Sequence, residues 1–470
     1  MKGTGKSASA KMSLLSCTLM GIGSIVGASV FATTPLSIQI VGGNGIVIGY
    51  LFASLFVFIK TLPEMVLISA LPATGASYMH LTRLVHPALG ILNAFNQLVI
   101  GSMKIVTLAL TFSTYLAMLL PNISEKAVAA PVVLVFTIIS CFGVQISAWV
   151  QNICVAVLLV TLGIYVFGGW GATTVSLEEV ITSTWELTSM WAAMGVMHGS
   201  LMGANVLMYA ADEIDKPSKN IPIAFVVGTL VTAIFYAGIG YVTVGVMPNY
   251  NDIDNLATVA AKFLSPGMTA FFICGGALLA VVTSINACIL MFSRSHFAAA
   301  RDCLFPQGIV KLNKHNVPAN AIWLNSGIAI AAILTGYNVS DVINITSIPG
   351  LLLAPLTFCA IFVLPKRYPN AYKASFLRIP HWLNCIIVVV ATFFSFATGG
   401  SLAKQMAPKN YLLVIGFYIA AAIYTYFRNR YIVKTQGRSL FEIMRTPYEP
   451  WNEREAAAKE ALERGDKVFI

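Results

Sequence analysis

Charged side chains are scarce in this chain of 470 residues, where Asp, Glu, Lys and Arg together make up only 10% of the sequence. A soluble domain carries about 25% of them. Hydrophobic residues reach 57%, and the mean hydropathy is +0.79. These proportions exclude an ordinary soluble domain and indicate a polytopic membrane protein that has the lipid bilayer as its surroundings.

The eight cysteines include no Cys-x-x-Cys pair, and all lie in apolar segments or at their ends. A disulfide framework or a firm metal site is therefore not expected, no cofactor is implied, and the cysteines are interpreted as small packing residues. A cleavable signal peptide is not expected either, because the first apolar run is too long and lacks a suitable cleavage site.

Lys and Arg exceed Asp and Glu by 29 to 19, yet no nucleic-acid-binding motif accompanies this charge. The basic residues gather before the first apolar run and after even-numbered runs. Such an asymmetry orients membrane proteins, so we expect a protein of the cell (cytoplasmic) membrane with both termini in the cytoplasm. The sequence gives no oligomeric state.

Apolar runs of membrane-spanning length recur about twelve times. They lie near 12–40, 45–71, 88–120, 127–143, 148–168, 188–212, 222–247, 267–300, 319–336, 341–364, 380–399 and 409–432. We therefore predict an all-α membrane protein with a transmembrane domain over 1–434. Residues 435–470 form a polar cytoplasmic tail, interpreted as solvated, with a short surface helix over 454–464.

The first apolar run contains small residues where a membrane helix is usually solidly apolar. Residues 19–31 include Gly21, Gly23 and Gly27, and Ala28 and Ser29 follow directly. Non-helical backbone at membrane depth has to line a cavity or bind a ligand, because lipid leaves its polar groups without partners. A break here offers free N–H and C=O groups and two half-helix dipole ends to a small zwitterion.

The sixth run has a similar interruption, over residues 198–205. Two interrupted spans that lie five apart indicate an inverted repeat with a substrate site between its halves. The repeats would cover about 12–168 and 188–364, with two additional helices over 380–432. The alternative is that small residues only allow helices to approach closely, but matching positions in both halves favour a site.

Five motifs in register resemble the amino acid–polyamine–organocation (APC) transporter superfamily, which has the leucine-transporter fold. Residues 23–31 are similar to its first-helix signature, and Glu64 with residues 72–78 is similar to its second-helix pattern. Residues 212–222 resemble the segment that follows its sixth helix. The stretch after span eight continues the resemblance through Ser293, Arg294, Ala300, Arg301, Asp302, Leu304, Phe305, Pro306, Lys311, Asn313, Pro318 and Ala321. The resemblance covers roughly 12–432.

The resemblance implies where an amino acid would bind. In this family the unwound first helix holds the substrate carboxylate through backbone N–H groups, which correspond to Gly27, Ala28 and Ser29. The ammonium group is bound by backbone carbonyls, which correspond to Ile25, Gly199, Ser200 and Met202. Two further residues of the second interruption, Gly203 and Asn205, complete the predicted substrate-binding set.

The chain departs from the family pattern at several of these positions. Ala28 and Ser29 stand where the family usually has Ser or Thr and then glycine, and Gly199 stands where it often has an aromatic residue. Asn205 replaces an acidic residue of some members, which suits a polar neutral side chain better than a guanidinium. Leu158 occupies the position of a lysine that proton-coupled members often carry.

Ionisable residues within the spans are candidates for coupling or gating, because charge is costly in a bilayer. Lys104 could face the cavity, or could snorkel or pair with Glu64. Glu64 could be structural or gating, and His198 could line the break or relay a proton. Thr283 and Ser284 could bind Na⁺, although such hydroxyls usually bond to their own backbone.

These observations predict a secondary active transporter, a permease or antiporter, for an amino acid or related amine, working by alternating access. The alternatives are a sodium-coupled symporter of the same fold and a non-transporting amino acid sensor, and H⁺ or Na⁺ would be the coupling ion. An enzyme is not expected, because no convincing catalytic arrangement is present.

Overall fold

The computed structural model describes residues 11–465 except 28, 44, 121–123, 143–147, 210, 212–213 and 316. Within these ranges the chain is helical, and an isolated bridge between Met12 and Ile214 is the only β-type pairing. The predicted all-α class is therefore confirmed.

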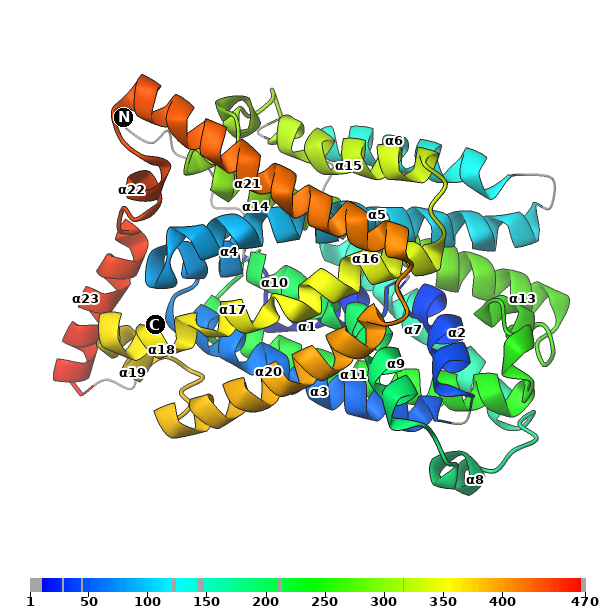
Figure 1. Cartoon of the computed structure of the whole chain (residues 1–470). Helices are drawn as coiled ribbons and strands as arrows, with labels where there is room; N and C mark the ends of the chain where they lie inside the picture. The colour runs from blue at the N-terminus through cyan, green and yellow to red at the C-terminus, as the bar shows by residue number, and fades with distance from the viewer. Residues whose placement is uncertain are drawn as a thin grey trace.

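The first part of the bundle runs from α1 to α7 (Figure 1). Its elements are α1 (Leu14–Ile25), α2 (Ser29–Val41), α3 (Ile46–Ala70), α4 (Ala76–His80), the π-helical η1 (Leu81–Val85), α5 (Pro87–Leu119), α6 (Glu125–Cys141) and α7 (Ala148–Trp170). The short α8 (Leu177–Thr182) follows, at the end of the bundle opposite α23.

The second part carries the next set of long helices and the tail. Its elements are α9 (Leu187–Leu201), the 3-10 helix η2 (Met202–Asn205), α10 (Val206–Tyr209), α11 (Pro217–Val246), η4 (Tyr250–Asp252), α12 (Leu256–Ala260), α13 (Pro266–Phe271), η5 (Phe272–Leu278), α14 (Leu279–Arg301), η6 (Gln307–Val310), α15 (Ala319–Leu334), α16 (Val339–Leu352), α17 (Ala354–Phe358), α18 (Ala360–Arg367), α19 (Pro369–Ala374), α20 (His381–Ala403), α21 (Pro408–Gln436), α22 (Leu440–Met444) and α23 (Glu449–Glu463).

Proline marks the start of many of these helices. Pro87, Pro217, Pro266 and Pro408 are the first residues of α5, α11, α13 and α21. The first turn of a helix has no intrahelical partner for its N–H groups, so a residue without an N–H and with a fixed φ costs nothing there. The sequence therefore sets these helix starts locally.

Eight helical segments are long and apolar enough to cross a membrane, among the described residues. Helices α1 and α2 make a ninth if the bent pair counts as one span, and α6 and α15 contain shorter apolar helices. A multi-pass membrane protein follows from these lengths. The count of twelve spans and the inverted repeat stay predictions.

The helices differ in how far they are enclosed. In α5, 72% of the most apolar stretch is buried, against 11% in α21. Large apolar side chains such as Leu412 and Phe427 point outward from α21. Side chains of this kind on an outer face are stable against lipid, so α5 lies in the interior of the bundle and α21 at its edge.

Two of the sequence motifs meet at one end of the bundle. Arg83 of η1 forms a bidentate ion pair with Asp302, with N···O distances of 2.5 and 2.6 Å. The Tyr78 hydroxyl donates to the same carboxylate at 2.7 Å. The segment after span two is thereby fixed to the segment after span eight, 219 residues away.

The tail packs against this same end, which we call the tail end, and is not solvated as interpreted from the sequence (Figure 1). A capping box between Ser439 and Glu442 starts α22. Helix α23 begins at Glu449, five residues before the predicted helix, and Trp451 within it is fully buried.

Trp451 and Arg454 fasten α23 to the bundle. The Trp451 indole stacks on His80, with ring centroids 5.3 Å apart, and donates to the Pro72 carbonyl at 3.2 Å. Burial lowers the pKa of His80 to about 4, so its ring is neutral at pH 7. Burial also lowers the pKa of Arg454 to about 10, yet it stays charged at pH 7 and donates to the Ala70 carbonyl at 2.7 Å.

Replacing Trp451 by alanine is expected to release the tail from the bundle. Truncating a buried tryptophan lowers stability by about 3–5 kcal/mol. Here the loss would destabilise the docked position of the tail relative to the released one. Chymotryptic cleavage after Phe441 or Tyr448 in the purified protein should therefore become much faster. Trp382→Ala is the matched control, because that side chain is 65% exposed. Equal cleavage rates in the two variants would contradict the docked arrangement.

Candidate substrate cavity

The first interruption separates α1 from α2, whose axes are bent by 43°. The chain leaves helical geometry at Val26 and Gly27, and Ala28 lies outside the described residues. A Cβ atom on Gly27 would lie 1.9 Å from the Ser284 hydroxyl oxygen. The absence of a side chain thus allows α14 to approach the interruption closely.

The second interruption is a tightening of the helix. After α9 ends at Leu201, residues 202–205 form the 3-10 helix η2 before α10 begins. A Cβ atom on Gly203 would lie 2.0 Å from the Ser24 carbonyl oxygen and 2.5 Å from the Ile25 nitrogen. The two interruptions therefore touch through their backbones, and glycine makes this contact possible.

Three of the predicted binding residues form hydrogen bonds within the protein, and for Ile25 the bonded group is the predicted carbonyl itself. The Tyr236 hydroxyl donates to the Ile25 carbonyl at 2.6 Å, and the Ser200 hydroxyl donates to Met197. The Ser29 carbonyl accepts from Thr33 at 2.9 Å. Because a carbonyl oxygen has two lone pairs, the Ile25 carbonyl keeps one for a further donor.

A cavity of about 150 Å³ lies beside η2. Six of the predicted site residues line it: Glu64, Lys104, His198, Gly199, Met202 and Asn205. The others, namely Ile25, Gly27, Ser29, Ser200 and Gly203, do not line it. Their roles in binding stay predictions, as does that of Ala28.

Lys60 is a cavity residue that the sequence reasoning missed. Its Nζ lies 2.6 Å from Nε2 of His198, and the side chain is 5% exposed. Glu64 follows one turn later on α3 and accepts from the Thr357 hydroxyl at 3.1 Å. The sequence did contain a signal for Lys60, because it lies four residues before Glu64 in an apolar run, and this spacing places the two on one helix face.

Lys104 approaches the same cavity from α5. It has electrostatic interactions with His198 and Cys288, but no hydrogen-bond or ion-pair partner among the residues that the structure describes. Of the two interpretations of Lys104, the structure thus supports a position at the cavity. Glu64 has Lys60 as its nearby cation instead.

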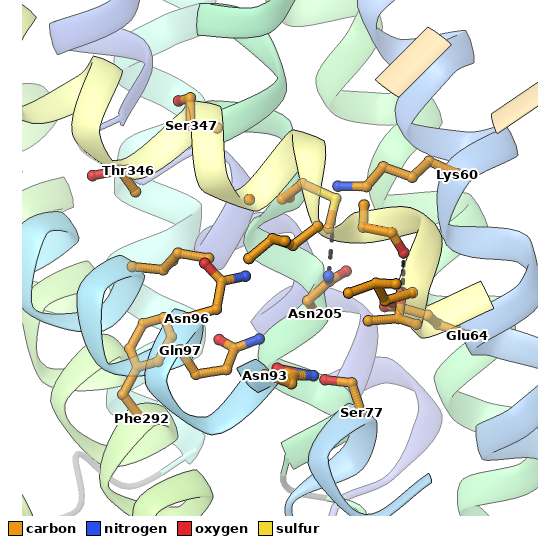
Figure 2. A pocket seen from close by; sticks show the side chains of 18 of the residues that line it. Lys60, Glu64, Ser77, Asn93, Asn96, Gln97, Asn205, Phe292, Thr346 and Ser347 are labelled. Carbon is orange, nitrogen blue, oxygen red and sulfur yellow. Dashed lines mark hydrogen bonds between the residues drawn. The ribbon is translucent and has the colours of Figure 1, made fainter. Parts of the chain in front are cut away.

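A stripe of carboxamides on α5 forms the wall that faces Glu64 (Figure 2). The stripe consists of Asn93, Asn96 and Gln97, and Lys104 continues it two turns further. Spacings of three, four and seven place these residues on one helix face. The sequence contains this periodicity, but the sequence analysis identified only Lys104 as a candidate and not the three carboxamides.

Unpaired polar atoms surround the cavity. Both side-chain polar atoms of Asn93, Oδ1 of Asn205 and Nδ1 of His198 are buried without a partner among the described residues. Buried polar groups are nearly always hydrogen-bonded, and leaving one unpaired costs about 1–3 kcal/mol. A polar ligand in the cavity would supply the missing partners.

The predicted sodium ligands lie outside this cavity. Thr283 donates to the carbonyls of Leu279 and Ala280 in its own helix, whereas Ser284 lies against Gly27. No group of three or more His, Cys, Asp or Glu that could hold a metal occurs in the described ranges. The assignment of Na⁺ to Thr283 and Ser284 remains a prediction.

Comparison with known proteins identifies relatives along most of the chain. It is 24% identical over 401 residues to the methylthioribose transporter of Bacillus subtilis (strain 168). The aligned region covers 80% of this chain and 85% of that protein. It is 22% identical over 404 residues to the branched-chain amino acid permease BcaP of the same organism, covering 78% and 84%.

A more partial similarity links the chain to the vacuolar cationic amino acid transporter 4 of Arabidopsis thaliana, at 26% identity over 249 residues, 51% of this chain and 41% of that protein. The profile of the amino acid permease family matches residues 12–423. The resemblance to the APC superfamily is thereby confirmed, and the chain belongs to the amino acid permease family of transporters.

Proposed function

We propose that this protein is a secondary active permease that moves an amino acid or a related amine across the cytoplasmic membrane by alternating access. One observation carries the proposal: the two helix interruptions touch at Gly203, next to a cavity with unpaired polar atoms. Irregular backbone at membrane depth is stable where it lines such a site.

The substrate head group would bind between the interruptions. Its carboxylate would accept from the N–H groups of Gly27, Ala28 and Ser29, at the positive end of α2. Its ammonium group would donate to carbonyls at the negative end of the preceding half-helices. Those carbonyls belong to Ile25, Gly199, Ser200 and Met202, of which Gly199 and Met202 line the cavity.

The substrate side chain would extend toward the carboxamide stripe. Amides donate and accept hydrogen bonds, and Lys104 adds a positive charge without a carboxylate partner among the described residues. This lining suits a polar side chain, neutral or acidic. The relatives carry methylthioribose, branched-chain and cationic amino acids by their names, so the cavity lining of each chain is what would select its substrate.

The tail end would face the cytoplasm. Its connecting segments and tail carry Arg83, Arg367, Arg428 and Arg445, and positive residues in short loops favour the cytoplasmic side. Both chain ends, including the tail over 435–470, would then be cytoplasmic, in a cell-membrane protein.

Coupling to protons would use the hydrogen-bonded pair of Lys60 and His198, which can share one proton beside Glu64. This pair would take the place of the lysine that is absent at Leu158. Coupling to Na⁺ is the second candidate, and it is supported by the contact of the Ser284 hydroxyl with the interruption at Gly27.

The test is uptake by the purified protein in liposomes, with a panel of labelled amino acids and amines and with pH and Na⁺ gradients varied separately. Accumulation driven by a pH gradient supports the proton pair, and accumulation driven by Na⁺ supports the site at Ser284. Exchange without either gradient supports an antiporter. Binding without flux would identify a sensor. The absence of both binding and flux would overturn the proposal.

Adding one methyl group at Gly203 is expected to abolish transport. In Gly203→Ala the new Cβ would meet the backbone of Ser24, which has no freedom to rotate away. Uptake should fall at least tenfold. Gly400→Ala is the control, because a Cβ there meets no atom within 4 Å. Thermal unfolding of both purified variants separates a misfolded protein from an inactive one. Normal uptake by a folded Gly203→Ala protein would contradict the proposed contact.

Removing the charge of Lys104 is expected to change side-chain selectivity. A hydrogen bond to a charged group is worth about 1.5–3 kcal/mol, so Lys104→Gln should weaken competition by glutamate relative to glutamine about tenfold or more. Lys262→Gln serves as the control, because Lys262 is exposed and lies outside the cavity. An unchanged ratio in competition uptake would exclude contact between Lys104 and the substrate side chain.

A further inference from the structure

A second cavity, of about 460 Å³, lies between the tail and the bundle. We call it the tail cavity. The bundle contributes Arg83, Arg367, Tyr368 and Asn370, and the tail contributes Arg445, Pro447, Asn452, Glu455, Ala456 and Lys459. Helix α23 packs against α19 at this place (Figure 1). The cavity thus exists only while the tail is docked.

The tail cavity is lined by four cationic side chains and one carboxylate. That carboxylate, Glu455, already accepts hydrogen bonds from the bundle. Its Oε1 accepts from the backbone N–H and the side-chain amide of Asn370, at 3.0 and 2.8 Å, and its Oε2 accepts from the backbone N–H of Ala371 at 2.8 Å. Glu455 therefore stabilises the start of α19, and among the described residues it forms no ion pair with a lining cation.

Two of the four lining cations, Arg367 and Arg445, contact groups other than carboxylates. Arg367 donates to the Arg83 carbonyl, and Arg445 lies 3.2 Å from Nε2 of His86. Lys459 has only a long exposed pair with Glu463, at 4.0 Å. Such an exposed pair contributes little.

Among the residues that the structure describes, Arg83 alone of the lining cations has a close carboxylate partner, Asp302. Its side chain is about nine-tenths buried, and its Nε has no acceptor among the residues that the structure describes. Four lining cations face three carboxylates in or beside the cavity, namely Asp302, Glu455 and Glu463. An anion is what this cavity lacks.

We infer that the tail cavity binds a phosphate group, and that the bound phosphate holds the tail against the bundle. Guanidinium groups match phosphate oxygens in planar, paired hydrogen bonds. The ligand would bridge the two sides of the cavity, with Arg367 on the bundle and Arg445 and Lys459 on the tail. The phosphate could belong to an anionic lipid headgroup or to a free phosphate compound, and both offer the same oxygens.

The experiment measures how well the tail resists chymotrypsin in the full-length protein. One arm titrates inorganic pyrophosphate into detergent-solubilised protein in phosphate-free buffer. The other arm compares nanodiscs of phosphatidylcholine with nanodiscs that also contain phosphatidylglycerol. Protection by pyrophosphate assigns a free phosphate, and protection only by phosphatidylglycerol assigns a lipid. Protection in neither arm overturns the inference.

The site is tested with the double variant Arg445→Gln/Lys459→Gln. The matched control is Arg438→Gln/Arg464→Gln, which removes the same charge from exposed tail positions that do not line the cavity. The first variant should need at least tenfold more ligand for half-protection, and the control should behave like the unmodified protein. An equal shift in both variants would mean that only total charge matters and would overturn the site. Uptake does not enter this readout, so the outcome is independent of the proposed transport function.

Discussion

The contact between the two helix interruptions is the constraint on which the arrangement around it depends. Gly203 lies against the backbone of Ser24 and Ile25, where no side chain fits. This contact places the end of α1, the 3-10 helix η2 and the start of α2 in one small volume. Tyr236 and Ser284 then pack around it, from α11 and α14. The cavity with its polar lining lies directly beside this junction.

Ionisable side chains line the cavity inside the bundle. Lys60 and His198 pair with each other, and Glu64 is held by Thr357, so most of the charge has a partner. The unpaired atoms of Asn93 and Asn205 are different, because burial without hydrogen bonds is unfavourable. Partly satisfied polar networks of this kind are typical of sites that a ligand completes.

At the tail end, electrostatic and aromatic contacts join parts of the chain that are far apart in sequence. The pair of Arg83 and Asp302 connects η1 to the end of α14, and Trp451 and Arg454 attach the tail to the same region. The carboxylate of Glu455 then fixes α19 to α23. Basic side chains of the same region line the tail cavity.

Composition, apolar periodicity and glycine positions determined the all-α membrane class, and the family motifs indicated the transporter family. These properties are local, since helix lengths, proline starts and helix breaks follow from neighbouring residues. The count of twelve spans and the repeat stay predictions, because length alone does not establish that a bent or short helix crosses the membrane.

Only the tertiary structure decided which polar residues share a space. Lys60 meets His198 across 138 residues of sequence, Gly203 meets Ser24, and the tail folds back to bury Trp451. Spacing along one helix shows which side chains share a face, as with Asn93, Gln97 and Lys104. It does not show which other helix that face meets, because packing between distant segments depends on the whole set of apolar surfaces being buried at once.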